Sequence, residues 1–441
     1  RKDTRRRAGG GGAGATARNV TGPAHRPAPV SGAGAPCGGV SPSSPWLPDA
    51  IGVRLSRPHP MPFRLRASLR EVAAPVLKQY PTVWSAACAV DRAVERARHT
   101  AARALPVLIR PEPRQIHLAI TAHCNQRCIG CRYGRDFMPG AQLPWPVVRD
   151  LLDDAAQLGI WRVRYYGGEP LLHRDLPRMV AHGAALGLDQ YVTTNAVRLE
   201  RHIDDLYAAG LRQLTVGFYG VGEAYDRYVQ RPGQFAHVER GIAAVRERYG
   251  ADVRLRLNWL LMRPSCSVEA LDAMLAFAER YDLVVQVDLV HYSLPYFTEG
   301  PDGCLQFRPE DAPRLREVVA ELVRRKERDP ARFTQSIVGL RSIADWLLCG
   351  SEMRVPCDSH QMLWVGADGS VQQCYVTFAL GNLHADRLPA LLFTEAHRRA
   401  ARDSYALNCP NCHCGYDTRV EKHGPSARRY GRDAGPAAVT R

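Results

Sequence analysis

Between residues 116 and 291 the sequence alternates regularly between apolar segments of strand length and amphipathic segments of helix length. Strands that alternate with helices imply a parallel sheet with the helices packed against it. We expect six strands, at residues 116–121, 161–166, 190–195, 213–219, 253–261 and 283–291. The helices between and after them are expected at residues 144–158, 175–186, 200–209, 235–248, 268–281 and 309–328. The carboxyl ends of all six strands then meet at one edge, where barrels of this kind carry their active sites.

Three cysteines follow the first predicted strand directly, as Cys124, Cys128 and Cys131 in a C-x3-C-x2-C pattern. Three thiolates can hold three irons of a [4Fe-4S] cluster and leave the fourth iron open to a small molecule. Zinc would normally take four ligands in paired groups, and His123 is available to complete such a set. The apolar strand before the cysteines, and a second motif at the end of the next strand, favour the cluster.

That second motif is Gly167-Gly168-Glu169-Pro170, directly after the strand predicted over 161–166. Two motifs in this order, both at strand ends, are a stronger signal than either motif alone. From residue 116 to residue 292 the chain resembles the radical S-adenosylmethionine (SAM) enzymes. The resemblance implies a partial (β/α)6 barrel of the TIM type, a [4Fe-4S] cluster on the three cysteines and SAM bound at the open iron. It also implies that the GGEP turn binds the methionine ammonium group of SAM.

Residues at the ends of later strands are further candidates for SAM contacts under this resemblance. Asn195, Tyr219 and Asn258 lie at or near the ends of the third, fourth and fifth strands, where the family contacts the ribose and carboxylate. Asn195 could equally cap a turn, and Tyr219 could be a core residue. The residue before the third cysteine is often aromatic in the family and packs near the adenine, but here it is Gly130. Tyr133 is our candidate to take over that contact.

Two further cysteines are candidate catalytic residues. Cys266 follows the fifth predicted strand, and Cys304 lies in the long loop after the sixth. A buried free cysteine is usually a small hydrophobic residue. A thiol beside a substrate radical would instead donate a hydrogen atom, which an epimerase requires and a dehydrogenase does not.

A second cysteine-rich region begins beyond residue 333, where the alternation stops. An Asp-Gly turn between strands at 362–365 and 370–375 predicts a hairpin, and a helix is predicted at 388–406. The region resembles the SPASM extension of radical SAM proteins, or its shortened twitch form. The resemblance implies an auxiliary [4Fe-4S] cluster on Cys357, Cys374, Cys409 and Cys412. Two cysteines, Cys414 and Cys349, are left over, and either could replace one of the four.

The spacing of these cysteines leaves the metal open. A structural zinc hairpin would use the same four ligands, although the radical SAM motifs upstream favour iron and sulfur. A complete SPASM domain would continue with more cysteines, but Thr418 stands where the next one is due. We therefore expect one auxiliary cluster rather than two.

The two ends of the chain differ from its body in composition. Residues 1–60 contain eleven Gly and nine Pro without apolar periodicity, which is typical of a disordered segment. The formal net charge of +15 is concentrated in residues 1–60 (+7) and 419–441 (+4), so a nucleic-acid partner is not implied. We expect a disordered segment at 1–60, a helical region at 61–110, the barrel at 111–330, the auxiliary-cluster domain at 331–418 and a basic flexible tail at 419–441.

Met61 stands where the helical pattern starts, and we hypothesise that the native chain begins at or near it. Nine of the thirteen cysteines are clustered as ligands, which favours a reducing cytoplasm over a secreted, disulfide-bonded protein. No run of 18 or more apolar residues is present, so no membrane span is expected.

The resemblance implies an enzyme, a radical SAM oxidoreductase or epimerase. It would cleave SAM reductively to a 5'-deoxyadenosyl radical, with an electron from a donor such as flavodoxin or ferredoxin, and abstract hydrogen from a substrate. We expect that substrate to be a small polar metabolite of sugar or aminocyclitol type in natural-product biosynthesis. The alternatives are a maturase of a ribosomally made peptide, and a non-catalytic iron-sulfur or zinc protein that serves as scaffold or electron carrier. The GGEP motif argues against the last, because a carrier has no need of a SAM site.

Overall fold

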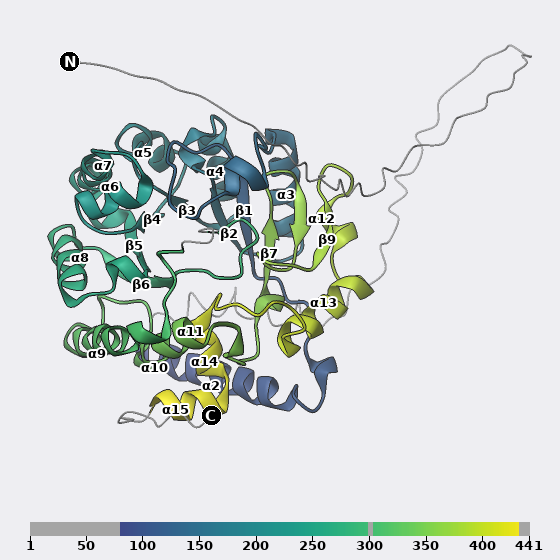
Figure 1. Ribbon diagram of the computed structural model, residues 1–441. Helices are drawn as coiled ribbons and strands as arrows, with labels where there is room; N and C mark the ends of the chain where they lie inside the picture. Colours follow the sequence, from purple (N-terminus) through teal and green to yellow (C-terminus); the bar gives the residue numbers. More distant parts are fainter. Residues whose placement is uncertain (1–79, 299–302, 432–441) are drawn as a thin grey trace, which may run out of the picture. The chain divides into compact units, whose positions relative to one another are not determined.

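A curved nine-stranded sheet runs through the residues that the computed structural model describes, 80–298 and 303–431 (Figure 1). The strand order is β6-β5-β4-β3-β2-β1-β7-β8-β9, and every neighbouring pair from β6 to β7 is parallel. The first six strands are β1 (Gln115–Thr121), β2 (Arg162–Gly167), β3 (Asp189–Thr194), β4 (Gln213–Phe218), β5 (Arg254–Leu261) and β6 (Val284–Leu289). Each predicted strand is confirmed, with its ends within two residues of the expected ones.

Helices alternate with these strands and cover the outer side of the sheet (Figure 1). They are α3 (Trp145–Gln157), α4 (Leu176–Ala185), α5 (Leu199–Ala208), α6 (Glu223–Val229), α7 (Gln234–Tyr249), α8 (Val268–Arg280) and α9 (Ala312–Arg328). The parallel strands and their helices form the partial barrel that was predicted. The short helix α6 was not predicted.

Residues of alternate type line the two faces of each barrel strand. In β5, Leu255, Leu257, Trp259 and Leu261 face the helices and are at most 3% exposed. Burial of each such side chain stabilises the fold by about 1.5–3 kcal/mol. The intervening residues, among them Arg256 and Asn258, face the barrel interior and stay half-buried, and β2, β3 and β6 repeat the pattern. The interior is therefore polar, unlike the packed interior of a complete TIM barrel.

The predicted C-terminal hairpin is confirmed, and it continues the barrel sheet. Strand β7 (Met362–Val365) pairs in parallel with β1, from Gln115 opposite Met362 to Leu118 opposite Val365. Strands β8 (Ser370–Gln372) and β9 (Ala379–Asn382) follow in antiparallel order. Residues 331–418, expected as a domain of their own, are thus joined to the barrel through the strand that precedes the first cysteines.

The helix predicted over 388–406 is interrupted and forms two helices, α12 (Leu388–Leu391) and α13 (Glu395–Ala406). Leu392 has an extended backbone (φ −93°, ψ 156°), which ends the first helix, and Phe393 follows with a positive φ of 59°. Thr394 then caps the second, because its side chain accepts a hydrogen bond from the backbone N–H of His397.

The prediction of a flexible tail is wrong for residues 419–431. They belong to α14 (Tyr416–Lys422) and α15 (Gly424–Gly431), and Arg419, Val420 and Tyr430 are buried. Arg428 and Arg429 lie on the exposed side of α15, whereas Arg419 is buried. Of the predicted N-terminal helical region, α2 (Pro81–Ala101) is confirmed, and it contacts α14 (Figure 1). Residues 61–79, the predicted disordered segment 1–60 and residues 432–441 lie outside the described part of the chain.

A search of the helices in the described part of the chain finds none whose length and hydropathy suit a membrane span.

Candidate active site

The first three cysteines lie on one loop at the carboxyl end of β1. Neighbouring elements hold this loop by backbone hydrogen bonds. The N–H of Ile129 donates to the carbonyl of Tyr228 (2.9 Å), at the end of α6. The N–H of Arg132 donates to the carbonyl of Tyr296 (2.9 Å), in the segment after β6. The strands from β2 to β6 separate the cysteine loop from this last segment in sequence, and the fold brings the two together.

The three thiols are close enough to affect one another electrostatically. Burial raises the pKa of Cys124 to about 12, and the charges of Glu169 and Cys131 add to this. Burial and the other two cysteines raise the pKa of Cys128 well above its ordinary value. Deprotonating all three thiols therefore requires a cation between them. An iron-sulfur cluster with three thiolate ligands fits this donor set.

The GGEP turn is wedged against the cysteine loop. The N–H of Gly168 donates to the carbonyl of Thr121 (2.8 Å), and the N–H of Glu169 donates to that of His123 (2.8 Å). A Cβ atom at Gly167 would lie 2.2 Å from the Thr121 oxygen, and one at Gly168 would lie 2.3 Å from the His123 oxygen. Only glycine permits this approach.

The Glu169 side chain is fully buried and points into the protein. Its carboxylate accepts hydrogen bonds from the Leu171 N–H (3.0 Å), the Thr194 hydroxyl (2.6 Å) and the Asn195 N–H (2.7 Å). Burial nevertheless raises its pKa to about 7. Because these donors occupy the carboxylate, its place in the structure is to anchor the turn. A contact between GGEP and a SAM ammonium group falls to the backbone carbonyls of the turn.

Asn195 and Tyr219 both lie beside the cysteine loop, and their contacts with SAM stay a prediction. The side-chain amide of Asn195 donates to Asn125 Oδ1 (2.7 Å) and lies 4.0 Å from the sulfur of Cys124. Its side-chain oxygen accepts from the N–H of Val197 (3.1 Å), so it also caps a turn. Tyr219 packs 4.3 Å from the ring of Tyr228, and the neighbouring charges that raise its pKa include Cys128 and Cys131.

Asn258 keeps a polar side-chain atom free for a ligand, whereas the hydroxyl of Tyr133 is already hydrogen-bonded. Asn258 faces the barrel interior, donates to Asp288 Oδ2 (3.0 Å) and keeps a buried side-chain oxygen without a partner. Tyr133 is 3% exposed, and its hydroxyl accepts from the backbone N–H of Ala367 (3.2 Å) in the hairpin turn. Tyr133 thus joins the cysteine loop to the C-terminal hairpin, and its contact with the adenine stays a prediction.

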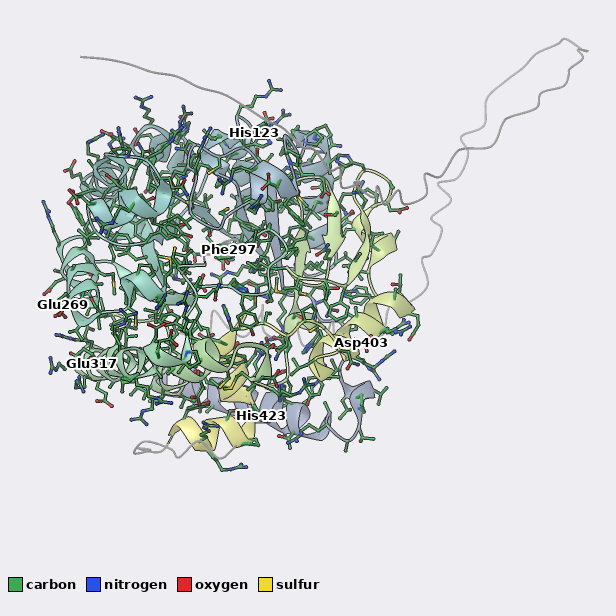
Figure 2. All side chains as sticks on the ribbon, viewed as in Figure 1. His123, Glu269, Phe297, Glu317, Asp403 and His423 are labelled. Carbon is green, nitrogen blue, oxygen red and sulfur yellow. The ribbon has the colours of Figure 1, made fainter. Side chains whose placement is uncertain are left out.

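Phe297 is a site residue that sequence reasoning missed. Its ring lies over Gly130, where a Cβ atom would approach it to 2.7 Å. The N–H of Thr298 donates to the carbonyl of Gly130 (2.9 Å) and fixes this arrangement. Figure 2 shows Phe297 near the centre of the view. An aromatic ring thus covers the position before the third cysteine, although the sequence has glycine there.

Five of the six C-terminal cysteines form a second group. Electrostatic interactions connect Cys357, Cys374, Cys409, Cys412 and Cys414 with one another. The pKa of Cys412 is lowered by a hydrogen bond from Cys414 and by the charge of Arg419. Cys349 is exposed, and its charged neighbours are Asp345, Arg429, Arg316 and Glu352. The group therefore contains the four predicted ligands and Cys414, while Cys349 lies apart.

Arg419 holds this second group together. The side chain is 1% exposed and donates to three backbone carbonyls, those of Cys412, Val355 and Pro356. Its guanidinium also lies 4.8 Å from the centre of the Trp346 ring. One arginine thus fastens the loop of Cys409, Cys412 and Cys414 to the segment that leads to Cys357. Nothing in the cysteine pattern predicted this role.

The described residues contain no set of three His, Cys, Asp or Glu side chains that converges as ligands of a single metal ion.

Tyr296 lies near both cysteine groups. The neighbouring charges that raise its pKa include Cys131 of the first group and Cys414 of the second. Its ring packs edge-on against Tyr133, with 5.1 Å between centres. The sulfur of Cys414 in turn lies 3.3 Å from Nε2 of His291, at the end of β6. The space between the groups is therefore bounded by the segment that follows β6.

The barrel interior next to these groups carries a positive charge. Arg164 of β2 donates to the Thr193 hydroxyl (2.9 Å) and to the Tyr375 hydroxyl (3.0 Å), and its guanidinium lies 4.7 Å from the Tyr166 ring centre. Among the described residues, no carboxylate forms an ion pair with it. Burial and the charge of Arg164 hold the pKa of His117 well below its ordinary value. The alternation of Arg162, Arg164 and Tyr166 along β2 was the signal that could have indicated a charged interior.

The two candidate hydrogen donors differ in their surroundings. Cys266 is 1% exposed within the hydrophobic core, and its charged neighbours are Arg314, Asp311 and Glu317 rather than the cysteines of either group. Cys304 is exposed. A small hydrophobic residue is the better description of Cys266 here.

Comparison with known proteins agrees with this geometry. Residues 118–258 match the Radical SAM superfamily. A GTP 3',8-cyclase of Mycolicibacterium smegmatis is 35% identical over 137 residues, which cover 30% of this chain and 38% of that protein. A probable GTP 3',8-cyclase of Methanococcus maripaludis is 27% identical over 176 residues, 40% of this chain and 58% of that protein. The chain thus spans less than two thirds of the length of these relatives.

Two solved structures share the fold. Native anSMEcpe with bound AdoMet has a TM-score of 0.52 and 15% identity, over 66% of this chain and 83% of that chain. Streptococcus suis SuiB bound to the precursor peptide SuiA has a TM-score of 0.52 and 14% identity, over 69% of this chain and 70% of that chain. At these identities the likeness extends to the fold and not to the substrate.

Proposed function

We propose that this chain, which contains a radical SAM domain over residues 118–258, cleaves SAM reductively and abstracts hydrogen from a substrate held in the polar barrel interior. The observation that carries the proposal is the loop of three neighbouring thiols at the carboxyl end of β1, packed against the GGEP turn. A [4Fe-4S] cluster on Cys124, Cys128 and Cys131 supplies the electron when bound. A reduced flavodoxin or ferredoxin is the expected donor.

The residues around the cysteine loop orient SAM. Glu169 and Asn195 hold the GGEP turn, the end of β3 and the cysteine loop in one hydrogen-bonded unit. Phe297 and Tyr219 supply aromatic surface beside Gly130 and Cys128. Such pre-positioning lowers the barrier because the reacting groups need no further ordering.

The second cysteine group supports an auxiliary [4Fe-4S] cluster on Cys357, Cys374, Cys409 and Cys412, with Cys414 as a further candidate ligand. A cluster there would accept an electron from the substrate radical, which gives net oxidation. The position of Tyr296 near both groups supports a substrate position between them. Redox-neutral epimerisation is less well supported, because Cys266 lies in the core.

The barrel interior favours a small polar substrate with an anionic group. Arg164 offers a guanidinium that has no carboxylate partner among the described residues, and guanidinium groups bind phosphate and carboxylate well. Asn258 contributes an unpartnered buried oxygen to the same interior. The names of the GTP 3',8-cyclase relatives fit this class, whereas nothing specifically supports a sugar or aminocyclitol. A peptide substrate, as in SuiB, is the second candidate, and the shared fold is its support.

The decisive experiment measures iron, sulfide and Mössbauer spectra of anaerobically reconstituted protein, together with 5'-deoxyadenosine formed from SAM under reduction. We expect about eight irons in the wild type and about four in the triple variant Cys124/Cys128/Cys131→Ala. Only the wild type should form 5'-deoxyadenosine. A wild-type protein that holds both clusters but neither binds nor cleaves SAM would contradict the proposal.

Substrate class can be tested separately by measuring how candidate substrates stimulate 5'-deoxyadenosine formation. For an anionic substrate, Arg164→Gln should raise KM by at least about tenfold, which corresponds to about 1.4 kcal/mol. Arg201→Gln, at an exposed site on α5, is the matched control. Equal KM values for the two variants would contradict the role of Arg164.

A further inference from the structure

A cavity of about 270 Å³ opens at the amino ends of β2, β4, β5 and β6. The cysteine loop lies at the opposite, carboxyl ends of the strands. Four arginines line the cavity, namely Arg162, Arg246, Arg254 and Arg256. Its lining also includes Tyr191 and one carboxylate, that of Asp282. A cavity of this composition is strongly basic.

The strands themselves explain why the arginines meet. Arg254 and Arg256 are two residues apart on β5, so both side chains face the barrel interior. Arg162 begins β2 and also faces inward, further along the curved sheet. Interior-facing residues at the starts of parallel strands share one end of the barrel. The arrangement is thus built into the rigid sheet rather than into a surface loop.

Arg246 is not available to a ligand. Its guanidinium donates to the backbone carbonyls of Tyr281, Asp282, Gly250 and Val253, at 2.6–2.9 Å. It therefore closes one wall of the cavity, as a structural residue.

The other three arginines keep unused donors. Arg256 donates one hydrogen bond, from Nη1 to Gln286 Oε1 (3.1 Å). Arg162 forms an ion pair with Asp189 (Nε to Oδ2, 3.2 Å) and donates from Nη2 to Gln213 Oε1 (3.4 Å), which leaves its Nη1 without an acceptor among the described residues. The Arg254 side chain has no hydrogen-bond or ion-pair partner within the described ranges 80–298 and 303–431. Several N–H groups are thus directed to the cavity without an acceptor.

The positive charges also repel one another. The pKa of Arg256 is lowered by burial and by the charges of Arg162, Arg254 and Arg164, with Tyr191 acting in the opposite sense. Like charges at close range in a partly buried site are unfavourable. An anion in the cavity would relieve this repulsion and accept the free N–H groups.

We propose that this cavity is an anion site for a small phosphate-bearing molecule. Guanidinium groups that approach from two strands can each hold two oxygens of one phosphate, which a single carboxylate cannot offer. The volume accommodates the phosphate and a few attached carbon atoms. The ring of Tyr191, with the Arg162 guanidinium 4.9 Å from its centre, supplies a flat wall for the organic part. The site is separate from SAM cleavage and does not depend on the proposed function.

The test is calorimetric titration of the reconstituted, SAM-saturated protein with inorganic phosphate, with pyrophosphate and with ribose 5-phosphate. We expect saturable binding that weakens at least tenfold in Arg254→Gln and in Arg256→Gln. Arg201→Gln changes the net charge equally at an exposed position on α5 and should bind as the wild type does. Tighter binding of ribose 5-phosphate than of phosphate identifies an organic phosphate as the ligand class, whereas the reverse order identifies the free anion.

The folding of both cavity variants is checked by circular dichroism and thermal unfolding, which do not depend on SAM cleavage. Arg254 is exposed, so its replacement leaves the core intact even if Arg256→Gln is poorly folded. Absence of saturable binding at millimolar phosphate, or an equal loss of binding in the Arg201→Gln control, would overturn the proposal.

Discussion

The two cysteine groups are organised around buried charged residues of opposite sign. At the first group, the fully buried carboxylate of Glu169 ties the GGEP turn to the end of β3. At the second, the buried guanidinium of Arg419 ties two chain segments together through their carbonyls. The first group is also local, since one loop carries all three cysteines, whereas the second gathers cysteines from three separate segments. At the first group, Glu169 therefore fixes the shape of a loop that already carries all three cysteines. At the second group, Arg419 is needed to bring the cysteine-bearing segments together.

The pKa values of the thiols also differ between the two groups. Burial raises the pKa of all three thiols at the first group, and mutual repulsion adds to this at Cys124 and Cys128. At the second group, Cys412 has a lowered pKa, since Cys414 donates a hydrogen bond to it and Arg419 adds positive charge. The protein itself therefore favours the thiolate form at Cys412, whereas nothing comparable lowers the pKa of a thiol in the first group.

Replacing Cys128 should break the local site completely. In Cys128→Ala the cluster loses one of three ligands, so SAM cleavage should fall to background while the second group keeps its iron. The measurement is 5'-deoxyadenosine formation with iron content. Cys304→Ala, at an exposed cysteine, is the control and should cleave SAM normally. Retained cleavage in Cys128→Ala would show that this loop does not hold the cluster.

Replacing Arg419 should break the dispersed site alone. Arg419→Gln leaves several buried carbonyls without a donor, at a cost of roughly 3 kcal/mol or more. We expect about half of the iron to be lost, with SAM cleavage retained and product formation reduced. Arg419→Lys keeps the charge but not the planar fork, so it should restore little. Arg428→Gln, exposed on α15, is the matched control, and iron loss in that variant would contradict a specific role for Arg419.

Comparing variants of Cys414 and Cys349 tests which of these two cysteines belongs to the second group. Cys414→Ser replaces the sulfur that contacts Cys412 and His291 with a smaller oxygen that is a poorer iron ligand, so the EPR spectrum of the reduced auxiliary cluster should shift. Cys349→Ser should leave that spectrum unchanged, because Cys349 is exposed and has no cysteine among its charged neighbours. A shift in Cys349→Ser and none in Cys414→Ser would reverse the assignment.

Glu169, which anchors the first group, should make the free energy of unfolding depend on pH. The pKa of Glu169 rises from 4.5 to about 7 on burial, so the folded state binds a proton more tightly than the unfolded state. This stabilisation is complete below pH 4.5 and is lost as the pH rises through about 7, on the order of 3 kcal/mol in all. Glu169→Gln should lack this part of the pH dependence in urea unfolding measured across that window. Parallel curves for the two proteins would show that Glu169 does not titrate there.

Much of the barrel was predictable because its signals are local. The periodicity of residues 116–291 placed every barrel strand, and the loop of Cys124, Cys128 and Cys131 was indicated by the spacing of the cysteines together with the strand before them and the GGEP motif. The second group was predictable only as a set of candidate residues. The role of Arg419 could not be found, because a buried arginine and a tail arginine look the same in sequence. The approach of Phe297 to Gly130 and the position of Tyr296 depend on contacts between distant segments, which periodicity does not contain.

The pairing of β1 with β7 has a consequence for how the protein is made. About 240 residues separate the two strands, and at roughly 5–20 residues per second a ribosome needs roughly 12–50 s to synthesise that length. During this time one edge of β1 has no partner, and an unpaired apolar edge is a template for pairing with other chains. The same strand leads into three reactive thiols. A nascent chain whose translation stalls before β7 is therefore expected to aggregate or oxidise, so heterologous production should improve when elongation through residues 122–361 is fast.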